Sequence, residues 1–262
     1  MTALRNIGNI VQKEWRQYFV SPIAYVALAL WALVVGVFYF LRVGQFLQAS
    51  QQMAMRPGPY KPSINDWIIQ GNFYDMAIIA LFVMPMITMR LLAEEKRQGT
   101  LELLVTSPIT DLEIILGKFF GALSLYGLMV LTAFVNFGLL WLYAEKGAGP
   151  DWRPLFTGAL GLLLLGGSFI AVGLFFSSLT RNQIVAGTVT FVVFLVFWVL
   201  SALERMGGGA VFQVLAYLGL MDHVRDMFRG VIDLKDVVFY LSFIVFGLFL
   251  AQQSMESHRW RA

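Results

Sequence analysis

Long apolar runs separated by short polar segments dominate the chain, and they predict a bundle of membrane-spanning helices. A helix needs about twenty mostly apolar residues to cross a bilayer. The runs of that length lie at about residues 23–41, 75–93, 119–144, 154–180, 184–203 and 237–255. The pattern therefore predicts an all-α integral membrane protein with six spans, in which residues 1–262 form a single transmembrane domain.

Residues 2–20 alternate between apolar and polar positions at helical spacing. One face of a helix here would carry Leu4, Ile7, Ile10, Val11, Trp15, Tyr18 and Phe19, and the other Arg5, Asn9, Gln12, Lys13 and Arg16. A helix of this kind lies flat in the lipid headgroup region. Ser21 can then cap the first span, and Pro22 can occupy its first helical position.

The proline, glycine and polar residues between the spans predict the structure of the connections. Residues 43–74 predict an exposed loop, because Arg56-Pro57-Gly58-Pro59 and Lys61-Pro62 disfavour a long helix. Residues 204–236 lie outside any span. Within them, residues 210–221 are apolar over only about a dozen positions, which predicts a short re-entrant or interfacial helix.

Three features of the spans themselves bear on packing. Pro85 should kink the second span or open one backbone hydrogen bond, and Arg90 near the end of that span can extend toward lipid phosphates. Gly117 and Gly121 form a small-xxx-small pair where another helix can approach closely. The fourth span is predicted to pack tightly because it carries Gly158, Gly161, Gly166, Gly167 and Gly173.

A polar island at residues 94–108 separates the second and third spans. Gly99 can end the preceding helix in the left-handed conformation, and Thr100 can cap a new short helix. The short helix would place Leu101, Leu104 and Val105 on one face and turn Glu102 and Thr106 away. It would stop near Ser107 and Pro108. Thr110 and Glu113 then have the spacing of a capping box, which predicts the start of the next helix.

The island and three further segments together resemble one protein family. The matching segments are Glu94 to Pro108, Ser21 to Tyr25, Gly117-Lys118, and Asp222-His223 with Arg229 to Asp233. They resemble the membrane subunits of type-2 ABC exporters, in the branch of the gliding-motility permeases and the permease for nitrous oxide reductase maturation. The resemblance implies that the short helix is a coupling helix seated in a groove of a separate ATPase subunit.

The resemblance also implies the partners and the residues that meet them. The coupling residues would be Glu94, Glu95, Gly99, Thr100, Leu101, Glu102, Leu104, Val105, Ser107 and Pro108. The chain would form a homodimer above an ABC ATPase dimer, which binds the ATP and magnesium, and an auxiliary extracytoplasmic protein would join it. It would lie in the lipid of the bacterial inner membrane with both termini in the cytoplasm. The alternative reading of the island is an interfacial loop that only links two spans.

Composition and missing motifs narrow the function classes. Charged residues make up 13% of the chain, against about a quarter in soluble domains. A net charge of +3 is too small to argue for nucleic acid, and without cysteine there is no thiolate metal site. Gly117-Lys118 is followed by Phe119 and lacks the preceding glycine of a phosphate-binding loop, so an ATPase or other enzyme has little support.

Several alternatives remain open at this point. A secondary carrier is disfavoured because few ionisable residues interrupt the spans, whereas a membrane anchor that transmits motion to an outer protein would have the same pattern as an exporter. Methionines could bind Cu(I), although packing is the commoner role of Met53, Met55, Met84, Met86 and Met89. For His223, a structural network is favoured over a ligand site. Lysine and arginine divide almost evenly between the two membrane faces, so charge does not decide the orientation.

Overall fold

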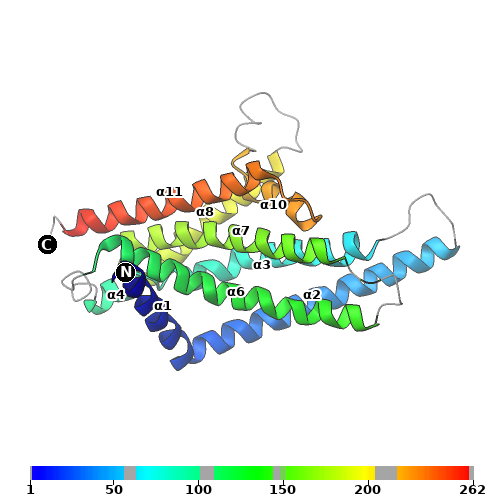
Figure 1. Cartoon of the computed structure of the whole chain (residues 1–262), viewed down its shortest axis with the longest axis horizontal. Helices are drawn as coiled ribbons and strands as arrows, with labels where there is room; N and C mark the ends of the chain where they lie inside the picture. Colours follow the sequence, from blue (N-terminus) through cyan, green and yellow to red (C-terminus); the bar gives the residue numbers. More distant parts are fainter. Residues whose placement is uncertain are drawn as a thin grey trace.

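The computed structural model confirms an all-α architecture. It describes residues 2–55, 63–100, 109–143, 149, 151–203 and 217–259, and these form helices without strands. Six of the helical segments are long and apolar enough to cross a membrane. In Figure 1 the N-terminus, α4 and the C-terminus lie at the same end of an elongated bundle, as an even number of crossings requires.

The helices follow the predicted order, with longer bounds in several places. They are α1 (Thr2–Val20), α2 (Pro22–Met55), the π-helical turn η1 (Asn65–Ile69), α3 (Gln70–Thr88), α4 (Ala93–Gln98), α6 (Asp111–Tyr143), α7 (Trp152–Leu179), α8 (Gln183–Leu203), α10 (Leu220–Phe228) and α11 (Leu234–Arg259). The predicted capping box is confirmed at the start of α6. There the Glu113 amide donates to Thr110 Oγ1, and the Thr110 amide donates to Glu113 Oε2.

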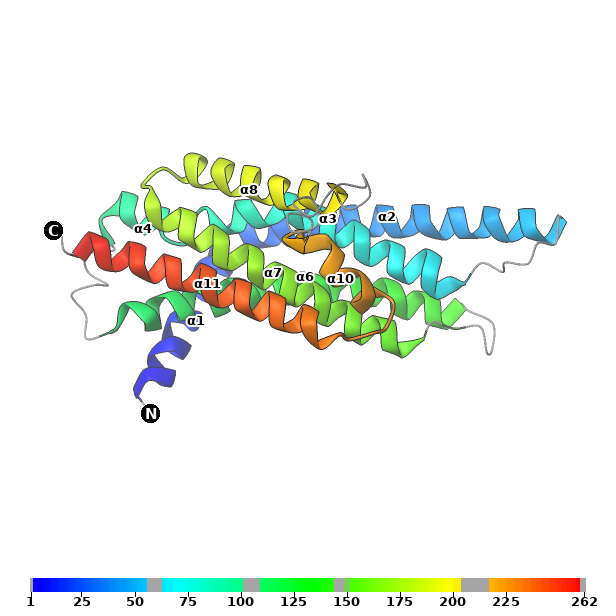
Figure 2. The same ribbon diagram turned by 90° about the horizontal axis from the view of Figure 1, so that it is seen from above.

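Helix α7 is the centre of the bundle. It packs against α3, α6, α8, α10 and α11, and Figure 2 shows it running through the middle of the molecule. Its glycines allow these contacts, as predicted. A Cβ at Gly166 would lie 2.1 Å from the Tyr126 ring, and one at Gly173 would lie 2.2 Å from Thr88 Oγ1. The glycine content of α7 therefore reflects close contact with neighbouring helices.

The loop predicted over residues 43–74 is wrong for most of its length. Helix α2 continues to Met55 over 34 residues, about 51 Å at 1.5 Å per residue, and projects beyond the other helices in Figure 2. The reason is that residues 43–55 contain no proline and are mostly glutamine, leucine, alanine and methionine, which favour helix. The prolines at 57, 59 and 62 lie outside the described residues.

A salt bridge fastens the extended α2 to the next helix. Arg42 donates to both carboxylate oxygens of Asp75, at 2.8 Å and 2.7 Å. The second span also begins earlier than predicted, since η1 and α3 place helix from Asn65 onward. Asp75, predicted to start this span, therefore lies inside a helix and is paired.

A short helix, α10, lies between the fifth and sixth spans and overlaps the end of the predicted re-entrant segment. Residues 210–216 of the predicted re-entrant helix lie outside the described residues, and the described helix α10 begins at Leu220. It includes the charged positions 222–226 because Leu220, Val224, Met227 and Phe228 form one apolar face, which is buried. Helix α10 packs on α7, α8 and α3, and Phe228 of the apolar face stacks on Phe73 of α3.

The second span is interrupted near its end, after Thr88. Helix α3 continues through Pro85 to Thr88, and α4 begins at Ala93 after a turn. The turn is closed by Ser177 of α7. The Ser177 hydroxyl accepts hydrogen bonds from the backbone amides of Leu92 and Ala93, each at 3.0 Å. It donates a hydrogen bond to the Met89 carbonyl at 3.1 Å.

Replacing Ser177 with alanine should destabilise the bundle, because three buried backbone groups at the interruption would lose their partner. We expect Ser177→Ala to lower the free energy of unfolding by about 1–3 kcal/mol, seen as a lower thermal midpoint in detergent. The control is Ser168→Ala on the same helix, since the buried Ser168 hydroxyl donates to Leu164 one turn earlier. Equal midpoints for the two variants would contradict this role of Ser177.

Candidate functional site

The predicted coupling residues fall partly on α4 and partly beyond the described residues. Glu94, Glu95, Gly99 and Thr100 are described, and the first two occupy the opening turn of α4. The remaining predicted residues, Leu101, Glu102, Leu104, Val105, Ser107 and Pro108, lie outside the described residues. The structure therefore defines the base from which the predicted coupling helix would extend.

Helix α4 ends as the sequence predicts. Gly99 has a φ of 71°, in the left-handed region where glycine carries no steric penalty. The Thr100 hydroxyl donates to the Glu95 carbonyl at 3.4 Å, so it contacts the helix behind it. Its predicted role as a cap involves residues beyond those described.

The two glutamates of α4 have different surroundings. Glu94 accepts from Arg90 Nε at 2.8 Å, so Arg90 is held by an ion pair instead of extending freely toward lipid phosphates. Glu95 is only 6% exposed and points toward α1 and α6. There it accepts from Lys13 on α1 and from Lys118 on α6, each at 3.0 Å.

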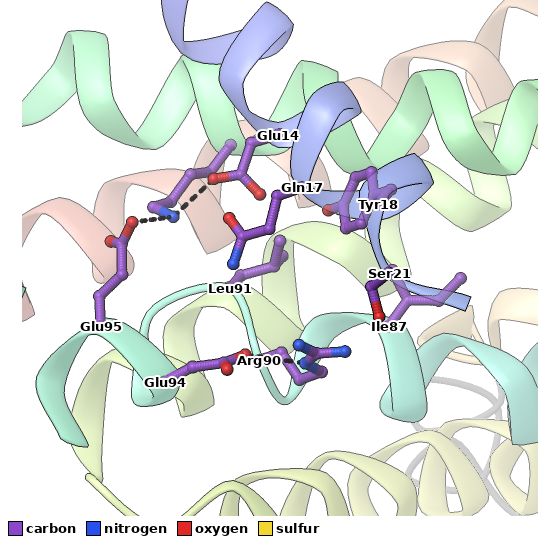
Figure 3. A pocket seen from close by; sticks show the side chains of 10 residues that line it. Glu14, Gln17, Tyr18, Ser21, Ile87, Arg90, Leu91, Glu94 and Glu95 are labelled. Atoms are coloured by element: carbon purple, nitrogen blue, oxygen red, sulfur yellow. Dashed lines mark hydrogen bonds and ion pairs between the residues drawn. The ribbon is translucent and has the colours of Figure 1, made fainter. Parts of the chain in front are cut away.

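Lys118 lies at the centre of a charge cluster, which we define as Glu14, Glu95, Lys118 and Lys13; the first three are buried and Lys13 is exposed. Lys118 Nζ lies 2.8 Å from Glu14 Oε1 on α1 and 3.0 Å from Glu95 Oε1 on α4. In Figure 3 the dashed lines run to Glu14 and Glu95 from the side chain between them. Lys118 is 2% exposed and Glu14 3% exposed. The buried part of the cluster holds one cation between two carboxylates, and the exposed Lys13 supplies the second cation.

Small residues on α6 bring the N-terminal helix within reach of Lys118. A Cβ at Gly117 would lie 2.5 Å from Ile10 Cγ2, and one at Gly121 would lie 2.9 Å from Glu14 Cβ. The close approach predicted for this glycine pair is therefore confirmed, and α1 is the helix that uses it. Leu4, predicted on the same apolar face as Ile10, is 79% exposed.

A small polar cavity adjoins the cluster. Its volume is about 30 Å³, and it is lined by residues that include Gln17, Tyr18, Arg90 and Glu95. This is room for about two water molecules. Glu95 Oε2 is buried there without a hydrogen-bond partner among the described residues. Burial raises the pKa of the Tyr18 hydroxyl well above its usual value, and the nearby Glu14 carboxylate raises it further, so Tyr18 stays neutral.

The other end of the bundle holds the predicted aspartate–histidine element. His223 Nδ1 lies 2.7 Å from Asp236 Oδ1, and Nε2 lies 2.8 Å from the Tyr217 carbonyl oxygen. His223 therefore belongs to a structural hydrogen-bond network, as favoured. Within the described ranges, no group of three or more His, Cys, Asp or Glu side chains is arranged to hold a metal ion. Met84 is buried whereas Met86 is 63% exposed, so the two have different surroundings.

Sequence reasoning missed the centre of this site. Glu14 was not assigned to a face, although it lies at helical spacing from Ile7, Ile10 and Tyr18, in the middle of the apolar stripe. A carboxylate at such a position indicates a buried partner, and that signal could have identified Glu14. The sequence identified Lys118 only as part of the family resemblance. Its ion pairs could not be predicted, because Glu14 and Glu95 lie in distant parts of the chain.

Comparison with known proteins agrees with this architecture. The profile of the family described as ABC-2 family transporter protein matches residues 8–251. The chain is 29% identical over 182 residues to the protein named "Probable multidrug ABC transporter permease YbhR" in Escherichia coli strains K12 and O157:H7. These alignments cover 68% of the chain and 46% of each relative, so the chain spans about half the length of the relatives it matches. Because the family profile covers most of the chain and the six apolar segments, this protein is a multi-pass membrane member of the ABC-2 transporter family.

Proposed function

We propose that this chain is the permease subunit of an ATP-driven exporter, and that a separate ATPase acts on it through residues 94–108. The observation that carries the proposal is the way α4, which forms the first part of this segment, is fixed to the bundle. Ser177 holds the amides at its start, the cluster holds Glu95, and Gly99 turns the chain at its end. Because α4 is fixed to the bundle in this way, a force that the ATPase applies to residues 94–108 would be transmitted to the other helices.

The proposed arrangement places the ATPase at the end of the bundle that carries both termini (Figure 1). This end would face the cytoplasm of a bacterial inner membrane, where α1 would lie among lipid headgroups with its exposed Arg5 and Arg16. Two ATPase subunits would bind the ATP and magnesium. The curated relatives are named as permeases of an ABC transporter, which supports this division of roles.

A second copy of the chain would meet the face formed by α3 and α8. This face exposes large apolar side chains, including Ile78, Phe82, Met86, Val185, Val189 and Trp198. Phe82 also packs on Phe191 across the two helices, with ring centroids 5.3 Å apart. A pathway between two such faces would suit an amphiphilic cargo, a class consistent with the multidrug name of the relatives.

A second candidate function is the transmission of ATP-driven motion to an extracytoplasmic partner. The specific observation in its favour is the extension of α2, which carries no charged residue between Val43 and Met55 and projects past the bundle in Figure 2. Such a helix offers a contact surface to an auxiliary outer protein. This role corresponds to the gliding-motility and nitrous-oxide-reductase branch that the sequence segments resemble.

The coupling proposal predicts a specific loss of ATPase binding in Leu104→Asp. If Leu104 enters a groove of the ATPase, the carboxylate would be buried without a partner, which should lower affinity roughly a hundredfold or more. The measurement is co-purification with the ATPase and ATP turnover in lipid. Ser63→Asp at the opposite end is the control and should behave as the unaltered chain does. Full association and turnover in Leu104→Asp would show that the ATPase docks elsewhere.

The orientation can be tested in the same cysteine-free background. Single cysteines replacing Ser63 and Ser257 should differ in their reaction with an impermeant maleimide on intact cells. We expect labelling at position 63, which would face outward, and protection at position 257 until the cells are opened. The reverse pattern would contradict the proposed placement of both termini in the cytoplasm.

A further inference from the structure

We propose that Lys118 is a positioning residue that locks α1 and α4 onto the first turns of α6, so that the three segments move as one body. Its consequence for transport rests on the proposed function. When the ATPase displaces residues 94–108, the displacement would pass directly to α1 and α6. Neither the family resemblance nor the matched relatives assign this role to the cluster.

The geometry of the cluster shows how Lys118 holds α1 and α4 to α6. Lys118 is the lysine that contacts carboxylates from two other helices, Glu14 of α1 and Glu95 of α4. Its ammonium group is almost fully buried, so water cannot readily replace either contact. Pulling α1 or α4 away would leave a charged group buried without its partner, which is far less favourable than sliding apolar surfaces past each other.

Both helices are also held to the bundle by other polar contacts. On α1, Asn6 donates to Glu113 and the Trp15 indole donates to Ser124, both on α6. On α4, Lys96 donates to the carbonyl of Ser178 near the end of α7. Lys118 joins these two sets of contacts, because Glu14 of α1 and Glu95 of α4 both bind it in the interior, while the half-exposed Lys13 pairs with Glu95 at the surface.

The chain itself connects α1, α4 and the start of α6 to the spans. Helix α1 is followed directly by α2 at Pro22, while α6 is itself a span. Glu95 lies four residues before Gly99, where α4 ends. A body containing α1, α4 and the start of α6 is therefore continuous with two spans and with the segment proposed to meet the ATPase.

The test is the distance between α1 and α4 in the full chain. Spin labels on Gln12→Cys and Arg97→Cys, both exposed positions, would report it by pulsed electron resonance in nanodiscs of phosphatidylethanolamine and phosphatidylglycerol. We expect a narrow distribution in the otherwise unaltered chain. The variant Lys118→Met with Glu14→Gln removes the bridge and leaves the Lys13–Glu95 pair between α1 and α4. Because the Lys13 side chain is half exposed, that pair holds the helices only weakly, and the distance distribution should become at least twice as broad.

Controls separate this role from a loss of folding. Lys235→Met, which removes an exposed ion pair with Asp233 at the far end of the bundle, should leave the distribution narrow. If the double variant does not fold, Glu95→Gln gives the same test, since it keeps the Glu14–Lys118 pair and weakens the hold on α4 alone. An unchanged width in the folded double variant, or in Glu95→Gln, would overturn the proposal.

A second readout distinguishes failure of the lock from failure of the proposed function. With the ATPase bound at saturation, the double variant should lose at least fivefold in permease-stimulated ATP turnover while its affinity for the ATPase is unchanged. A broadened distribution with full stimulation would overturn the transmission role of Lys118. If the unaltered chain neither binds nor stimulates the ATPase, the proposed function fails, and the distance measurement still decides whether Lys118 locks the helices.

Discussion

A buried ammonium group needs carboxylate partners, and at Lys118 this requirement arranges three parts of the chain. Glu14 and Glu95 approach it from two different helices, and Gly117 and Gly121 provide the space that α1 needs to come so close. Removing either carboxylate would leave the buried Lys118 ammonium group with one of its two partners and would release one of the two helices. The N-terminal helix is thereby an integral part of the bundle.

A second constraint is that backbone groups within a membrane need partners inside the protein. The interruption of the second span after Thr88 satisfies it through the hydroxyl of Ser177, which contacts one carbonyl and two amides. The interruption allows α4 to take a separate position from α3. Together, Ser177 and the charge cluster fix the short helix from both sides, which is the physical basis for proposing force transfer at this end.

Sequence patterns with local causes were predicted correctly, and those with distant causes were not. The six apolar runs, the left-handed Gly99 and the capping box before α6 depend on neighbouring residues, so they could be recognised directly. The helical extension of α2 was not predicted, because the prolines after residue 56 were taken to exclude a helix from residues 43–55 as well. Ser177 carried no local signal, since a serine in a glycine-rich helix is ordinarily a packing residue. Glu14 did carry one, as a carboxylate within an apolar stripe.

The most direct measurement of the central claim is a pair of structures of the chain bound to its ATPase, one without nucleotide and one with ATP. We expect residues 94–108 to contact the ATPase in both. We also expect α1, α4 and the first turns of α6 to superpose as one body between the two states while the remaining spans shift around it. An ATPase seated away from residues 94–108, or α4 moving independently of α1, would contradict force transfer through this body.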